Sequence, residues 1–105
     1  MITDMTNIRW TAQIDRMPGA AYFRVFGTVT VTNSAHTPTL VRSEIQHKPG
    51  NLRLDLQIDT SGVGLTVLTK KLAEYKSADI PNVTSVSIFS EGKLVARINE
   101  ILITN

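Results

Sequence analysis

The chain of 105 residues contains no cysteine, which excludes disulfide bonds, thiol catalysis and cysteine-based zinc sites. Hydrophobic residues make up 42% of the chain and charged residues 19%, a composition typical of one globular domain that spans residues 1–105. The net charge of +2 comes from 11 basic and 9 acidic residues that are scattered along the sequence. Nucleic-acid binding needs a basic stripe with interleaved aromatic side chains, so no nucleic-acid partner is predicted.

The apolar stretches of the sequence are only a few residues long. A membrane-spanning helix needs about 20 apolar residues, so no membrane insertion is predicted. The first 16 residues also lack a basic segment followed by a hydrophobic run, which is the pattern of a secretory signal. The cytoplasm is therefore the default location, although an exported chain whose signal had been removed would carry the same sequence.

Two strands are predicted in the N-terminal third. The first is a half-buried strand in which polar residues alternate with apolar ones, namely Ile8, Trp10, Ala12 and Ile14. The second is longer, runs from residue 21 to residue 33 and carries one apolar side formed by Phe23, Val25, Val29 and Val31. Gly27 in the middle of this strand predicts a bulge or a bend.

A tight hairpin is predicted around Pro49-Gly50, because proline and glycine suit the two central positions of a type II turn. A two-residue loop would give one mostly apolar face, which pairs His47 with Leu52, Ile45 with Leu54, Ser43 with Leu56 and Val41 with Ile58. It would also give one polar face, which pairs Gln46 with Arg53, Glu44 with Asp55 and Arg42 with Gln57. Such a division is typical of a strand pair with one face on the core and the other in water.

The period of the apolar residues changes beyond residue 64. Leu65, Leu68, Leu72 and Tyr75 recur at helical spacing, with charged residues between them. The competing interpretation is a strand through residues 65–69 with only a short helical turn after it. We predict a strand followed by one helix of about three turns or fewer.

The C-terminal segment predicts another hairpin, from residue 83 to residue 103 with its turn at Glu91-Gly92. Two registers are open: a two-residue loop pairs Phe89 with Leu94, whereas a three-residue loop with a glycine bulge pairs Val86 with Ile98 and Ile88 with Ala96. We favour the second register. The apolar phase also changes between residues 98 and 101, which indicates burial on both faces or a bulge near Asn99-Glu100, and favours a central position in the sheet.

Six to seven short strands separated by turns predict a mainly β domain with at most one short helix. An antiparallel β-sandwich of the immunoglobulin-like kind is the preferred architecture, and a small barrel is the alternative. Architecture of this kind does not by itself reveal a function.

No catalytic residues, cofactor or metal site are predicted, and the chain is not expected to be an enzyme. The serines lie in strands or polar turns without a nucleophile-elbow pattern, and Gly62-Val63-Gly64 lacks the further residues of a dinucleotide or phosphate loop. His36 and His47 are the only histidines, and the predicted hairpin places them at opposite ends of one strand. They are therefore not expected to share a metal ion.

Four residues are candidate partner-binding residues. Glu44 and Asp55 face each other on the polar side of the predicted hairpin, where two carboxylates would attract a cation or a basic partner unless nearby arginines balance them. Tyr22 and Phe26 lie on the side of the second strand opposite its apolar residues. If they are exposed, they would form an aromatic binding patch.

These observations lead to two hypotheses. The first is a non-enzymatic protein interaction module, in which a sheet edge or the exposed aromatic face docks a protein partner or a second copy of the chain. The alternative is a β-sandwich that binds a small ligand or a carbohydrate in a pocket between its sheets or at one end. A pocket lined by Trp10 or Tyr75 would favour the alternative, and a filled interior with an apolar outer patch would favour the first.

Overall fold

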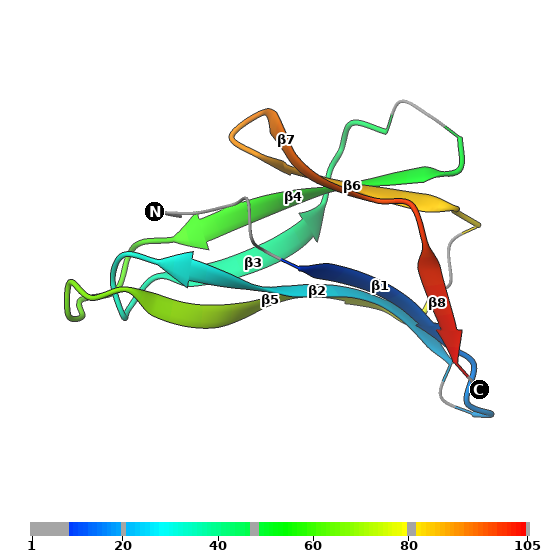
Figure 1. The fold of residues 1–105 in the computed structure, drawn as a ribbon, viewed down its shortest axis with the longest axis horizontal. Helices are drawn as coiled ribbons and strands as arrows, with labels where there is room; N and C mark the ends of the chain where they lie inside the picture. The colour runs from blue at the N-terminus through cyan, green and yellow to red at the C-terminus, as the bar shows by residue number, and fades with distance from the viewer. Residues whose placement is uncertain (1–8, 20, 47–48, 80–81, 105) are drawn as a thin grey trace.

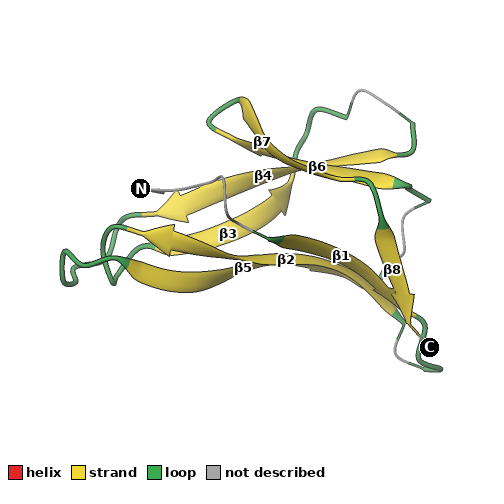
Figure 2. Ribbon diagram, in the orientation of Figure 1, coloured by secondary structure: helices red, strands yellow, loops and turns green. Residues whose placement is uncertain are grey.

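The computed structural model describes residues 9–19, 21–46, 49–79 and 82–104. Within these ranges the chain forms eight strands and no helix, so no described segment is a membrane-spanning helix (Figure 2). The strands are β1 (Trp10–Asp15), β2 (Tyr22–Val31), β3 (Thr37–Arg42), β4 (Asn51–Asp59), β5 (Thr69–Ser77), β6 (Ser85–Ser90), β7 (Lys93–Ile98) and β8 (Ile101–Thr104).

The strands form a β-sandwich of two four-stranded sheets (Figure 1). Sheet A has the order β5-β2-β1-β8, and sheet B has the order β3-β4-β6-β7. The β-sandwich prediction is confirmed, whereas the barrel alternative is wrong because both sheets have open edges. The expectation of purely antiparallel sheets is also wrong, since β1 pairs with β8 and β4 with β6 in parallel.

The core lies between the inner faces of the two sheets. The predicted apolar side of β2 is fully buried: Phe23, Val25, Val29 and Val31 each expose 0% of their surface. Sheet B contributes its alternate residues to the same core, namely Leu40, Leu52, Leu54, Leu56, Val86 and Ile88. Burying one such side chain stabilises the fold by about 1.5–3 kcal/mol, so these alternating residues determine which face of each strand turns inward.

Gly27 does not mark a bulge. It sits in regular register between Trp10 of β1 and Ala73 of β5. A Cβ atom at this position would lie only 2.5 Å from Cε3 of Trp10. The glycine therefore makes room for the indole ring, which packs against the core.

The predicted register of the hairpin between β3 and β4 is wrong. Val41 lies opposite Asp55 rather than Ile58, and Ile58 lies opposite Pro38. Gly50 has the positive φ, 79°, that a type II turn requires, but β3 already ends at Arg42 and a wide loop follows. The predicted pair of His47 with Leu52 lies partly outside the described residues.

The Gln46 side chain forms hydrogen bonds with the backbone of β4 in this loop. Its Oε1 accepts a hydrogen bond from the Arg53 backbone N–H, and its Nε2 donates to the Arg53 carbonyl, both at 3.0 Å. Nε2 also donates to the Ser43 carbonyl, at 2.7 Å. This side chain thus satisfies the Arg53 N–H, while the Arg53 carbonyl also accepts the backbone N–H of Ser43, which continues the observed register beyond Arg42.

The helix predicted within residues 65–76 is wrong. β5 instead pairs with β2 over nine residues, and Ala73 is its fully buried side chain. Leu65, Leu68 and Leu72 expose 71%, 69% and 58% of their surface, so their helical spacing does not reflect a buried face. Pairing with the longest strand of the sheet overrides the local pattern.

Both predicted registers occur in the C-terminal hairpin. Val86 pairs with Ile98, and Ile88 with Ala96, as favoured, but a bulge after Ile88 shifts the pairs nearest the turn to Phe89 with Leu94 and Ser90 with Lys93. Glu91 and Gly92, with φ of 52° and 80°, form the two-residue turn.

The change of apolar phase after Ile98 marks a change of sheet. β7 is the edge strand of sheet B, and after two intervening residues β8 begins as the edge strand of sheet A. The predicted central position is therefore wrong. The segment forms two strands where the sequence analysis expected one.

Candidate functional site

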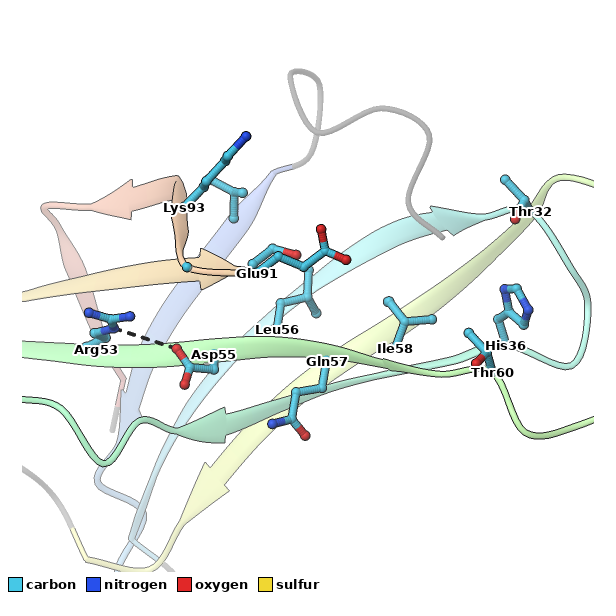
Figure 3. A pocket seen from close by; sticks show the side chains of 13 residues that line it. Thr32, His36, Arg53, Asp55, Leu56, Gln57, Ile58, Thr60, Glu91 and Lys93 are labelled. Atoms are coloured by element: carbon cyan, nitrogen blue, oxygen red, sulfur yellow. Dashed lines mark ion pairs between the residues drawn. The ribbon is translucent and has the colours of Figure 1, made fainter.

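A groove of about 810 Å³ opens in sheet B beside β4. β6 pairs with β4 only from Asn51 to Asp55, because the chain then reverses at the β6–β7 turn. Figure 3 shows Leu56 and Ile58 of β4 projecting toward the side of the groove on which Glu91 lies, while Gln57 projects to the other side. The groove therefore combines an apolar floor with a polar turn at its rim.

The edge of β4 is open along this groove. Among the described strands, none pairs with β4 beyond Asp55 on the side where β6 ends. Ser43 donates its backbone N–H to the Arg53 carbonyl at 3.1 Å. In an antiparallel pair, the backbone N–H and C=O groups of alternate residues point to the same neighbour, so those of the odd-numbered β4 residues point toward β3. The N–H and C=O groups of Ile58 therefore point away from β3, toward the groove.

Arg53 forms the wall of the groove next to β6. Its guanidinium carbon lies 3.8 Å from the centroid of the Phe89 ring, and its Nε lies 3.6 Å from Oδ1 of Asp55. The separation of Nε from Asp55 is short enough for an ion pair but too long for a hydrogen bond. The buried Nε has no hydrogen-bond partner among the described residues. The arginine is thus held by stacking and charge, with one donor unused.

Asp59 lies at the far end of β4. The hydroxyl and the backbone N–H of Ser61 both donate to its Oδ1, at 2.6 and 2.9 Å. These hydrogen bonds favour the charged carboxylate and lower the pKa of Asp59 below its ordinary value of 3.8, and the charge of His36 acts in the same direction. The strand end therefore carries a negative charge at neutral pH.

Glu44 and Asp55 do not face each other across the strand pair as predicted. Glu44 lies beyond the end of β3 and is exposed, and the residue opposite Asp55 is Val41. Asp55 instead forms an ion pair with Arg53 and contributes to the groove. The structure thus brings one of these two candidates, and not the pair, to the groove.

Tyr22 and Phe26 do lie on the outer face of sheet A, but each ring is half-buried and covered by a cation. Arg24 lies 4.2 Å from the Phe26 ring centroid, and the Nζ of Lys76 lies 4.4 Å from that of Tyr22. Arg24 also forms an ion pair with Glu74 of β5 at 3.5 Å. The two aromatic residues therefore belong to a polar network that spans neighbouring strands.

A second cleft, of about 750 Å³, opens where β7 passes into β8, and Trp10 lines it together with Arg9 and Arg97. The indole Nε1 of Trp10 is buried and has no hydrogen-bond partner among the described residues. Tyr75 is not at this cleft, since its ring packs edge-on against Phe23 in the core, with centroids 6.3 Å apart. The cleft thus has the tryptophan, but not the tyrosine, of the predicted ligand pocket.

The connection between β4 and β5 exposes a group of apolar residues that sequence reasoning missed. Val63, Leu65 and Leu68 expose 102%, 71% and 69% of their surface. The connection is held to the loop after β2, because Ser34 donates its N–H to the Leu65 carbonyl and accepts the Leu65 N–H at its Oγ, both at 2.9 Å. Because the leucines recur at helical spacing, the sequence predicted a helix in this region and not an exposed apolar group.

In the described part of the chain, no three residues of the types that bind metal ions gather into a possible site. His36 lines the groove, and His47 lies outside the described residues. Comparison of the chain with protein-family models, with curated proteins and with solved structures finds no match.

Proposed function

We propose that the chain is a non-enzymatic interaction module that binds an extended segment of a protein partner along the open edge of β4. The observation that carries this proposal is the groove beside residues 56–59, where β4 continues after its neighbour β6 has ended. An added strand would gain main-chain hydrogen bonds from β4, as in other cases of β-strand addition.

The dimensions of the edge limit the partner. Four residues of strand span about 13 Å at roughly 3.3 Å per residue, so about four residues of the partner would pair directly. Side chains of the added strand that point inward would meet Leu56 and Ile58, and its outward side chains would meet the charged rim formed by Asp55 and Lys93. The partner segment is therefore expected to alternate apolar and polar residues.

A random peptide library displayed on phage tests this proposal. Selected peptides are expected to bind Ile58→Pro roughly tenfold more weakly than Ile58→Ala, because both variants lose the side chain but only proline removes the N–H that points into the groove. Circular dichroism checks that both variants fold. Selection of no peptide, or equal binding to the two variants, would refute the proposal.

The second cleft favours a second candidate function, the binding of a small ligand or carbohydrate. Trp10 offers an aromatic surface there, and Arg9 and Arg97 would suit an acidic group. Trp10 is the only tryptophan of the chain, so its fluorescence reports on this cleft alone. A saturable change of emission on titration with monosaccharides and uronic acids would support this function, and a flat titration would count against it.

A further inference from the structure

The two sheets have four edge strands, and they differ in how they discourage the addition of another strand. Charged residues and proline are the usual means of protecting an edge. β5 carries Lys70, Lys71 and Lys76, β3 carries Pro38 and Arg42, and β7 carries Lys93 and Arg97. β8 has the sequence Ile-Leu-Ile-Thr and carries none of these features.

β8 is also exposed. Leu102 and Ile103 expose 49% and 54% of their surface, and in Figure 1 the strand lies at the outer end of sheet A. Among the described strands, β1 is its only partner. An uncharged, apolar edge of this kind is a template for pairing with another strand.

The backbone groups that this edge offers can be assigned. Arg16 donates its N–H to the Thr104 carbonyl at 2.7 Å, so the alternation of a parallel pair directs the N–H and C=O groups of Leu102 and Thr104 toward β1. The corresponding groups of Ile101 and Ile103 therefore point outward. The open edge presents two donors and two acceptors.

We propose that β8 pairs antiparallel with β8 of a second copy of this chain, around a twofold axis perpendicular to sheet A. In this register Leu102 faces Leu102 of the second copy, and Ile101 of each copy faces Ile103 of the other. The outward groups of Ile101 and Ile103 then lie in hydrogen-bonded pairs, which is the arrangement in which two residues exchange both bonds. The pairing gives four intermolecular hydrogen bonds and joins the two A sheets into one continuous sheet.

A second copy is the occupant that this edge fits, because the edge is complementary to itself. Isoleucine meets isoleucine on the inner face, and leucine meets leucine on the outer face. No like charges lie directly opposite each other, since Glu100 of one copy faces Thr104 of the other. The proposed peptide groove lies in the other sheet and stays open in this dimer, so the two proposals stand or fall separately.

The solution mass by light scattering across a concentration series tests the dimer. The mass is expected to rise with concentration toward twice the 11.6 kDa of the chain. Leu102→Lys and Leu102→Glu should each weaken association by about tenfold or more, because like charges would meet on the twofold axis, and mixing the two variants should restore it. Leu94→Lys is the matched control, because Leu94 is also 49% exposed but lies on β7.

A second variant tests the backbone hydrogen bonds of the β8 edge without changing the surface charge. Ile103→Pro removes an outward N–H and leaves the groups that bond to β1, so it should weaken association while circular dichroism still shows a folded sheet. A wild-type chain that stays monomeric throughout the series would overturn the proposal. Unchanged association of Leu102→Lys, or failure of the mixed variants to associate, would overturn it as well.

Discussion

Replacing Gly27 by alanine would place a methyl group where the Trp10 indole now lies. The added Cβ would be 2.5, 2.8 and 2.9 Å from Cε3, Cδ2 and Cζ3 of that ring. These distances are well below van der Waals contact, so either the ring or the strand must move. Overpacking of this kind destabilises a domain by about 1–3 kcal/mol. In a domain of this size, each 1 kcal/mol lowers the Tm by roughly 4–8 °C.

The sign of the effect should depend on Trp10. Glycine inside a strand is less stable than alanine by about 0.5–1 kcal/mol, because it loses more backbone entropy on folding. In a Trp10→Leu background the ring atoms are gone, so Gly27→Ala should become neutral or stabilising by up to that amount. Thr28→Ala, on the exposed face of the same strand, serves as a control and should change stability little.

Urea unfolding measures all four corners of this double-mutant cycle. Far-UV circular dichroism is the suitable signal, because Trp10 is the only tryptophan and its removal abolishes indole fluorescence. Equal slopes in urea would show that the variants unfold from comparable states. A neutral Gly27→Ala in the wild-type background, or an equal penalty in both backgrounds, would refute the argument that the indole requires the glycine.

Two further predictions concern the connections around β4. Gln46→Ala should lower the free energy of unfolding by about 1–3 kcal/mol in urea melts, because the N–H of Arg53 loses its partner while its C=O keeps the Ser43 N–H; a change no larger than that of Gln57→Ala would contradict this. Ser61→Ala should raise the pKa of Asp59 toward 3.8 in an NMR titration, since one of its two hydrogen bonds is lost. The lowered pKa makes Asp59 stabilise the fold above about pH 3.8. That contribution disappears as the pH falls through the folded-state pKa, and an unshifted titration in the variant would disprove its assigned cause.

The candidate site was only partly predictable from the sequence. Asp55 was identified as a partner-binding candidate, but for an opposition to Glu44 that does not form. The groove itself depends on where β6 ends relative to β4, and residues that pair in parallel across a long connection leave no local pattern in the sequence. The sequence does place Tyr22 and Phe26 on the outer face, yet only the neighbouring strands show that cations cover their rings.

Alternation of apolar residues determined the strands β1, β2 and β4, and which of their faces turns inward, because burial outweighs other local preferences in a period-two pattern. Gly92 likewise determined where the last hairpin reverses, since positive φ strongly favours glycine, whereas Pro49-Gly50 marked the start of β4 and not a tight hairpin. Tertiary structure alone decided the register of β3 with β4, and the strand at residues 69–77 through its pairing with β2. It also decided that the last segment crosses from one sheet to the other, because the choice of neighbour depends on backbone groups that every sequence shares.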